Sequence, residues 1–184
     1  MLHMGQEITE PVRCSLPVLG FAAYSGTGKT TLLTQLIPML REQGLRISMV
    51  KHAHHDFDVD KPGKDSYELR KAGATQMLIA SDRRMALMTE FDPPADPRLQ
   101  DLLMQLDPQR ADLVLVEGFK HEHFPKIELH RPSLGKPLMF PEDTDIFAVA
   151  CDAPLGRDCD RPLLDLNDLG AIRDFVLQWH RELT

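Results

Sequence analysis

Residues 23–30 have the types and spacing of a loop that binds phosphate groups. They read A-Y-S-G-T-G-K-T, with Ala23 where the motif usually has glycine. The two glycines let the backbone turn its N–H groups toward phosphate oxygens. The lysine can reach the β- and γ-phosphates, and the threonine after it can bind Mg2+ through its hydroxyl. This spacing predicts a nucleoside triphosphate site made of Ser25, Gly26, Thr27, Gly28, Lys29, Thr30 and Thr31.

An acidic residue on a neighbouring strand usually completes such a loop, and the apolar run 113–116 offers one. Glu117 and Gly118 follow it directly, at the strand end where α/β sheets bind their ligands. Glu117 can hold Mg2+ through a water molecule, and Gly118 can let its backbone N–H approach the γ-phosphate. We expect Thr30 and Glu117 to be the metal ligands. A surface carboxylate at a strand end is the alternative for Glu117.

A run rich in histidine and aspartate, K-H-A-H-H-D-F-D-V-D, occupies residues 51–60. Because it follows an expected strand, it should emerge at the phosphate end of the sheet and act as a switch segment. Asp56 could hold a water molecule on Mg2+ there. The expected catalytic residues are therefore Lys29, Asp56 and Glu117, while Asp58 or Asp60 could orient a lysine or a substrate.

Metal binding offers other interpretations of this run. A calcium loop is excluded, because Lys61 replaces the turn glycine and Tyr67 stands where a bidentate glutamate is needed. Imidazole binds zinc and nickel, so a transition-metal site could form from His52, His54, His55, His121 and His123. A polar loop whose histidines bond to carboxylates or solvent is the third interpretation.

The residue that reads the nucleotide base is poorly encoded, because the sequence contains no N-K-x-D segment. Asp152 follows the apolar run 146–151 and could accept hydrogen bonds from N1 and N2 of guanine. We expect Asp152 to contact the base, with a simple turn as the alternative.

Hydrophobic periodicity predicts the elements that must position these residues. Strands are expected at 18–22, 45–51, 113–116, 126–130 and 146–151, helices at 30–41, 66–72, 99–106 and 168–181, and a β-hairpin at 75–81 and 85–90. Pro38 should bend or shorten the first helix, and Gly44 should end it. The alternating order predicts an α/β, three-layer P-loop nucleoside-triphosphatase fold, with a mainly parallel sheet and an antiparallel β-hairpin insertion.

Length and composition limit the classes of protein. With 184 residues, we expect one nucleotide-binding domain over residues 17–184, after a loosely ordered tail over residues 1–16. A net charge of −7 argues against nucleic acid and anionic membranes as partners. No apolar run reaches the roughly 18 residues of a membrane span. Three cysteines without a C-x-x-C pair, and no secretory signal, predict a cytoplasmic location.

Five longer segments occur in the order F-A-A-Y-S-G-T-G-K-T-T-L-L, K-H-A-H-H-D, D-V-D-K-P-G-K-D-S-Y-E-L-R-K-A-G-A, A-L-M-T-E and L-V-L-V-E-G-F-K-H-E. Through them the chain resembles the MobB family of GTP-binding adapter proteins, which act in the biosynthesis of molybdopterin guanine dinucleotide, a molybdenum cofactor. The resemblance implies a homodimer that binds GTP and Mg2+ and hydrolyses GTP weakly. It implies the molybdopterin guanylyltransferase and a molybdenum-insertion protein as partners.

Two other functions remain compatible with the phosphate loop. A small-molecule kinase or ligase needs lid cations, which Lys64, Arg70 and Arg84 could supply. A GTPase that delivers a metal would bind it through the histidines of residues 52–55. For the adapter, slow hydrolysis is expected, with the bound nucleotide acting as a conformational signal or a substrate held for a partner, because neither the glutamine nor the arginine of fast GTPases is evident near the loop.

Overall fold

The computed structural model describes residues 10–53 and 57–184. The chain divides into two compact units. The first, here called the sheet unit, consists of Met1–His52 and Arg98–Thr184, and the second, the hairpin unit, consists of Ala53–Pro97. The single nucleotide-binding domain expected over residues 17–184 stays a prediction.

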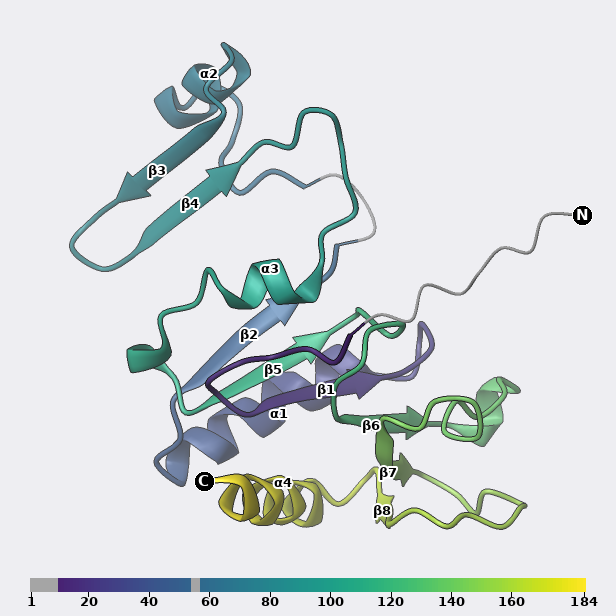
Figure 1. The fold of residues 1–184 in the computed structure, drawn as a ribbon. Coiled ribbons are helices and arrows are strands. Elements are labelled where there is room, and N and C mark those ends of the chain that lie inside the picture. The colour runs from purple at the N-terminus through teal and green to yellow at the C-terminus, as the bar shows by residue number, and fades with distance from the viewer. Residues whose placement is uncertain (1–9, 54–56) are drawn as a thin grey trace, which may run out of the picture. The chain divides into compact units, whose positions relative to one another are not determined.

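The sheet unit is built on six strands, in the order β2-β5-β1-β6-β7-β8 (Figure 1). They are β1 (Val18–Ala22), β2 (Ile47–Lys51), β5 (Leu113–Glu117), β6 (Lys126–His130), β7 (Ile146–Cys151) and β8 (Leu163–Asp165). Every neighbouring pair runs parallel. The predicted mainly parallel sheet is therefore confirmed, and the carboxyl ends of its strands lie along one edge. β8 was not predicted, because it has only three residues and two of them are exposed.

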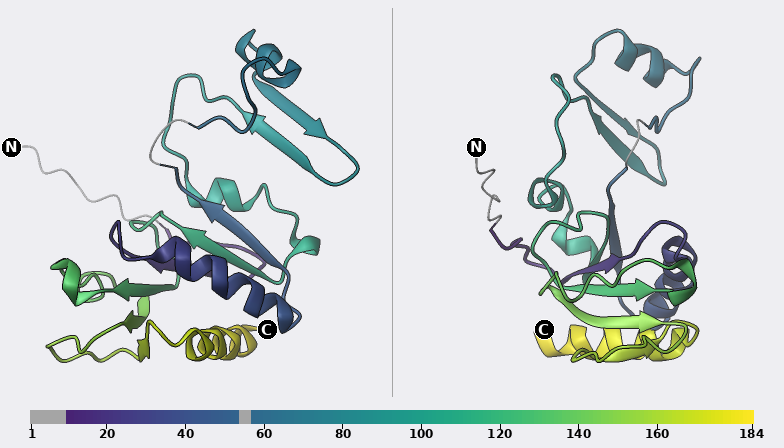
Figure 2. Two further views of the ribbon diagram at one scale, coloured as in Figure 1. Left: turned by 180° about the vertical axis from the view of Figure 1, so that it is seen from behind. Right: turned by 90° about the vertical axis from the view of Figure 1, so that its right-hand side faces the viewer.

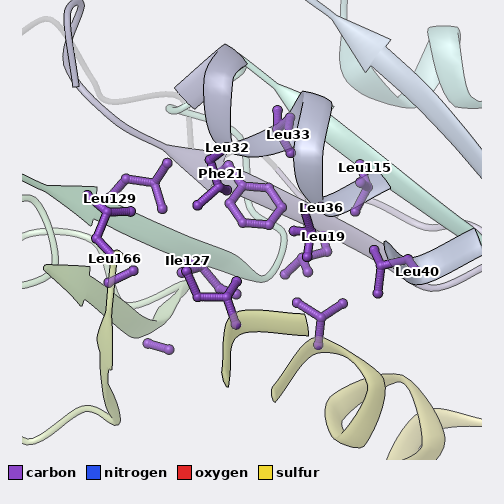
Figure 3. Close-up of a cluster of buried hydrophobic side chains, with 14 of the residues drawn as sticks. Leu19, Phe21, Leu32, Leu33, Leu36, Leu40, Leu115, Ile127, Leu129 and Leu166 are labelled. Carbon is purple, nitrogen blue, oxygen red and sulfur yellow. The ribbon is translucent and has the colours of Figure 1, made fainter. Parts of the chain in front are cut away.

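Two helices, α1 (Lys29–Glu42) and α4 (Leu169–Leu183), cover one face of this sheet (Figures 1 and 2). Figure 3 shows the core between helix and sheet, where Leu36 and Leu40 of α1 pack on alternate strand residues, namely Leu19, Phe21, Leu115, Ile127 and Leu129. The prediction that Pro38 could shorten α1 is wrong, because the helix continues past Pro38 to Glu42. Gly44, with a φ of 90°, then ends it by donating its N–H to the Arg41 carbonyl at 2.9 Å.

The opposite face is covered by α3 (Leu99–Leu103) and by the connection from β5 to β6. The ring of Phe124 in this connection lies directly on β1. A Cβ atom on Gly20 would be 2.5 Å from the ring's Cε2 atom, so only glycine fits there. The turns Pro108–Arg110 and Pro132–Leu134 are short 3-10 helices.

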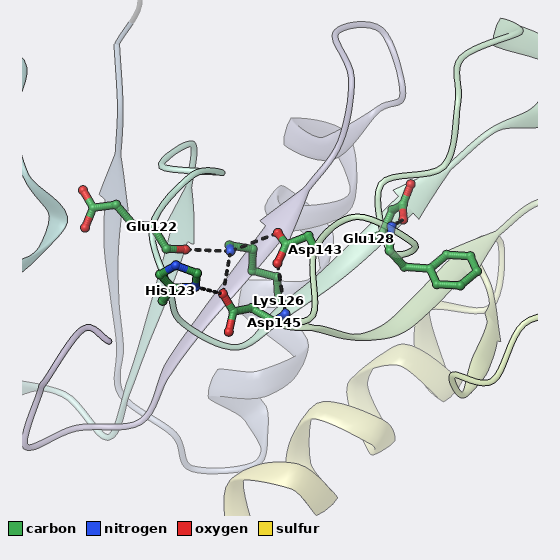
Figure 4. A network of polar contacts seen from close by, with 7 residues as sticks. Glu122, His123, Lys126, Glu128, Asp143 and Asp145 are labelled. Carbon is green, nitrogen blue, oxygen red and sulfur yellow. Dashed lines mark hydrogen bonds and ion pairs between the residues drawn. The ribbon is translucent and has the colours of Figure 1, made fainter. Parts of the chain in front are cut away.

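A buried lysine fixes the start of β6 (Figure 4). The side chain of Lys126 is 2% exposed, and its Nζ donates to the Glu122 carbonyl at 2.7 Å and to Asp143 at 3.1 Å. Asp145 lies 3.6 Å from the same Nζ and also accepts His123 Nδ1 at 2.8 Å. Because a buried ammonium group must be compensated by such partners, this network determines where β6 begins.

The buried carboxylate of Glu128 lies in the middle of the same strand (Figure 4). It accepts the backbone N–H groups of Met139 and Phe140, each at 2.8 Å. Burial raises the pKa of Glu128 above its ordinary value, against these two hydrogen bonds. Glu128 thus holds the segment 132–142 against β6.

The hairpin unit contains α2 (Asp65–Lys71) and two antiparallel strands, β3 (Gln76–Ala80) and β4 (Met85–Thr89). The predicted antiparallel hairpin is therefore confirmed. Within residues 10–53 and 57–184, no helix is long and apolar enough to cross a bilayer.

The expected N-terminal tail falls only partly within the described residues, which begin at residue 10. In the described part, Val12 donates its N–H to the His123 carbonyl at 2.9 Å. Arg13 and Gln100 exchange two hydrogen bonds of 2.8 Å, and Leu16 packs on the core beside α3.

Candidate functional site

The phosphate loop joins β1 to α1 at the carboxyl edge of the sheet. Gly26 and Gly28 have φ values of 85° and 95°, which side-chain-bearing residues rarely adopt. Thr27 is buried, and its hydroxyl donates to the Tyr24 carbonyl at 2.8 Å. Within the described part of the chain, no side chain caps the N-terminus of α1. The loop is therefore shaped to present an anion with backbone N–H groups and the positive end of a 14-residue helix.

The structure brings Lys29 and Glu117 together. Lys29 is the first residue of α1, and its Nζ lies 3.7 Å from Oε1 of Glu117, the last residue of β5. Lys51, the last residue of β2, places its own Nζ 3.5 Å from Glu117. Ser25, Thr30 and Thr31 are exposed on the loop and on the first turn of the helix. A lysine for phosphate and a hydroxyl and a carboxylate for a hard cation thus occupy one edge of the sheet.

Charged side chains of both signs lie at this edge. Lys29, Lys51 and Arg131 provide three cations there, against the carboxylates of Glu117 and Asp152. The chain as a whole has a net charge of −7. Next to the loop, the two lysines beside the single carboxylate of Glu117 favour a polyanionic ligand.

Gly118 meets a protein neighbour. It has a φ of 95°, and a Cβ atom there would lie 2.6 Å from the Cβ of His52. The close approach inferred from this glycine is therefore made by His52, whose backbone N–H donates to the Glu117 carbonyl at 2.9 Å. The contact of the Gly118 N–H with a γ-phosphate stays a prediction.

Asp152 lies just after β7 and is bound to Arg131, which follows β6. Arg131 Nη1 donates to Asp152 Oδ2 at 2.5 Å, and Arg131 Nε donates to the Thr27 carbonyl at 2.8 Å. The residue expected to read the base is therefore joined to the phosphate loop through one guanidinium group.

The histidine-rich run is described only in part. Asp56, His54 and His55 lie outside the described residues. His52 stacks on Phe119 with ring centroids 4.9 Å apart, and His123 pairs with Asp145. Over residues 10–53 and 57–184, no three His, Cys, Asp or Glu side chains are grouped to hold a metal ion.

Arg70, considered as a lid cation for a kinase, is buried in the hairpin unit. Its side chain is 6% exposed and bonds Asp58 at 2.5 Å, Asp60 at 2.7 Å and Glu90 at 2.8 Å. These carboxylates, Asp60 first, raise the pKa of Arg70 above its ordinary value, and the hydrogen bond from Arg70 lowers the pKa of Asp60. Arg70 is therefore not available to a phosphate, and Asp58 and Asp60 are occupied in holding it.

Sequence reasoning missed three residues of this edge. Arg131 could have been found, because it follows the predicted strand 126–130 at the same edge as Glu117. Lys51 ends a predicted strand in the same way. Nothing in the sequence marks Phe119, which is buried with a positive φ of 53°.

Comparison with known proteins adds the family context. The family model described as "MobB: Molybdopterin guanine dinucleotide synthesis protein B" matches residues 18–152. The chain is 53% identical over 165 residues to the molybdopterin-guanine dinucleotide biosynthesis adapter protein of Escherichia coli K12, covering 89% of this chain and 93% of that protein. The adapter protein of Haemophilus influenzae is 49% identical over 165 residues, covering 89% of each chain.

Solved structures agree with this match. The crystal structure of a MobB homologue from Bacillus stearothermophilus superposes with a TM-score of 0.65 at 28% identity. The match covers 90% of this chain and 98% of that one.

Proposed function

The chain belongs to the MobB family of molybdopterin-guanine dinucleotide biosynthesis adapter proteins, and we propose that it works there as a GTP-binding adapter. GTP would occupy the phosphate loop from Ser25 to Thr31, with Asp152 reading the guanine. The protein would act in the cytoplasm on the guanylyltransferase that attaches GMP to molybdopterin, and with a molybdenum-insertion protein downstream.

The observation that carries this proposal is the position of Lys29. Its ammonium group lies at the start of α1 and 3.7 Å from Glu117, beside a loop with two left-handed glycines. A flexible Gly/Thr turn would not require a buried Thr27 bonded to Tyr24. Lysine, loop amides and carboxylate together form a combination suited to a triphosphate with a divalent cation.

The residues at this edge fit Mg2+. Oxygen ligands suit this ion, and the exposed Thr30 hydroxyl and the carboxylate of Glu117 would hold it, the latter through water. When bound, Mg2+ would shield the charge of the phosphates. Lys29 would bind phosphate oxygens directly. The role expected for Asp56, which lies outside the described residues, stays a prediction.

Hydrolysis by the isolated protein should be slow. Of the basic residues at this edge, Arg131 approaches the loop, but its Nε and Nη1 atoms are engaged by Thr27 and Asp152. An arginine that is free to stabilise transition-state charge accelerates P-loop enzymes by about 10^3 to 10^5. Without one, the bound nucleotide serves as a conformational signal or as a substrate held for a partner. Rapid GTP turnover by the purified protein, with no effect on guanylyltransferase output, would contradict this mechanism.

The first prediction concerns Lys29. Lys29→Ala should weaken GTP binding by about tenfold to a hundredfold, because it removes a charge-assisted contact with phosphate. Isothermal titration calorimetry with GTP and Mg2+ measures the change. Arg41→Ala is the matched control, since Arg41 is exposed in the last turn of α1, at the end of the helix away from the loop. Equal GTP affinities for wild type and Lys29→Ala would refute the phosphate-loop assignment.

The partner can be tested directly. Immobilised wild-type chain should retain the guanylyltransferase, and GTP should change the retained amount. A turnover assay on the mixture should show greater guanylyltransferase output than the enzyme gives alone. The Lys29→Ala chain should fail to increase that output. No retention and no change in output would exclude the adapter function.

A further inference from the structure

Arg131 is placed to hold two parts of the candidate site in a fixed relation. Its Nε donates to the Thr27 carbonyl of the phosphate loop at 2.8 Å, and its Nη1 donates to Asp152 Oδ2 at 2.5 Å. Its Nη2 faces Gly28, where a Cβ atom would be only 3.7 Å away. The side chains of Arg131 and Asp152 are 33% and 20% exposed. This ion pair is therefore partly shielded from solvent.

The contact with Thr27 has a consequence for the phosphate loop. The Thr27 carbonyl and the Gly28 N–H belong to one planar trans peptide unit, in which the two bonds point in opposite directions. A donor that holds the carbonyl on one side therefore directs the Gly28 N–H toward the other side. An inward-facing N–H at this position is what a phosphate oxygen requires.

The contact with Asp152 constrains the other end of the site. Arg131 engages one lone pair of Oδ2, which leaves Oδ1 and the second lone pair of Oδ2 to accept from the N1 and N2 hydrogens of guanine. Guanidinium is planar and always charged, and its donors have a fixed relative geometry. Arg131 also follows a strand that is held firmly in place, because Lys126 and Glu128 anchor β6 through the contacts described above. A shift of Asp152 would therefore be transmitted to the Thr27 peptide.

We infer that Arg131 is a positioning residue that couples recognition of the guanine base at Asp152 to the shape of the phosphate loop. The inference rests on the proposed function and adds to it a residue that determines specificity. In this arrangement a triphosphate with the wrong base is bound by a loop that lacks its support. The preference for guanine thus depends on a side chain that touches neither the base nor a phosphate.

The test uses three ligands that report on different parts of the site. GTP engages both ends, ITP lacks the exocyclic amine that Asp152 reads, and inorganic tripolyphosphate engages the loop alone. Arg131→Gln should weaken GTP binding by about tenfold to a hundredfold, the value of a charge-assisted hydrogen bond. The ratio of GTP to ITP affinity should fall toward one, and tripolyphosphate should lose less affinity than GTP.

Two further variants separate positioning from charge and from stability. Arg131→Lys keeps the positive charge but loses the fixed arrangement of the guanidinium donors. Relative to Arg131→Gln, it should restore the affinity for tripolyphosphate, while the ratio of GTP affinity to ITP affinity should stay low. In a double-mutant cycle, Arg131→Gln and Asp152→Asn should be non-additive for GTP. Arg157→Gln is the matched control, because Arg157 is exposed and lies over Phe140. This variant should leave all three affinities unchanged.

The possible results separate a failure of the role given to Arg131 from a failure of the proposed GTP-binding function. The inference is overturned if Arg131→Gln keeps the wild-type ratio of GTP affinity to ITP affinity, or if the double-mutant cycle is additive. Neither result contradicts the proposed GTP binding. Loss of all three affinities in the same proportion, together with a lowered melting temperature, also overturns the inference, because it marks a purely structural role. A wild-type chain that binds neither nucleotide overturns the proposed function and the inference together.

Discussion

Gly118 and Gly44 have nearly the same backbone conformation but different surroundings. Their φ values are 95° and 90°, yet a Cβ on Gly118 would lie 2.6 Å from His52, whereas a Cβ on Gly44 would meet nothing within 4 Å. A left-handed alanine costs about 1–2 kcal/mol, and overpacking adds about 1–3 kcal/mol. Gly44→Ala should therefore lower the free energy of unfolding by about 1–2 kcal/mol and Gly118→Ala by about 2–5 kcal/mol. Urea denaturation measures both, and equal losses would show that the turn at His52 yields to a side chain.

At the scale of residues, the sequence predicts conformation better than it predicts neighbours. The glycines of the phosphate loop could be predicted, because positive φ values follow from the motif. The neighbour of Gly118 could not, since His52 lies 66 residues earlier in the chain. The same reason hides the partner of Asp152. An aspartate after a strand predicts a ligand, while its bond to Arg131 depends on how two loops meet.

Among the elements, β2 and β5 are joined at their starts by one ion pair, between Arg46 just before β2 and Asp112 just before β5. Arg46 donates to both oxygens of Asp112, at 2.7 Å and 3.0 Å, and its backbone N–H donates to Oδ2 at 2.7 Å. These hydrogen bonds lower the pKa of Asp112 from 3.8 to about 2. A carboxyl group with a lowered pKa stabilises the fold above its unfolded pKa and loses that effect as the pH falls through its folded pKa.

A pH series tests this junction. Asp112→Asn should lower the urea midpoint at neutral pH, and the difference from wild type should shrink between about pH 4 and about pH 2. Asp174→Asn is the matched control, because Asp174 pairs with its neighbour Arg173 within one helix and joins no two elements. A constant difference down to pH 2 would mean that Asp112 acts through something other than its charge.

Most elements could be predicted, because their apolar periodicity is strong. α1, the hairpin and the four central strands fall within two residues of their predicted bounds. α3 ends three residues earlier than predicted, at Leu103. β8 carries too little apolar pattern to be predicted and exists because it pairs with β7.

For the molecule as a whole, the hairpin unit presents apolar side chains that no other described residue of that unit covers. Leu78 and Leu87 face each other across β3 and β4 and are 61% and 51% exposed, and Met85 beside them is 74% exposed. A two-stranded sheet is marginal alone, and such a surface favours pairing with an identical one. We propose that the chain is a homodimer through this face.

Light scattering at micromolar concentration tests the dimer. Wild type should have twice the mass of one chain, and Leu87→Asp should shift it to the mass of one chain, because the substitution would bury an unpaired charge. Leu183→Asp is the control, since Leu183 is 58% exposed at the end of α4. A wild-type mass of one chain would remove the proposal.

The pairing of β1 sets the order in which the sheet can form during synthesis. Val18 pairs with Val114 and Gly20 with Lys126, so the ribosome makes β1 on the order of 10 s before either partner strand. The strands of the hairpin, in contrast, pair with each other and follow one another directly in the chain. The hairpin can therefore form before β1 has a partner strand. The nascent chain carries β1 as an unpaired apolar strand through most of its translation. Such a strand is open to chaperones and to aggregation until β5 and β6 emerge.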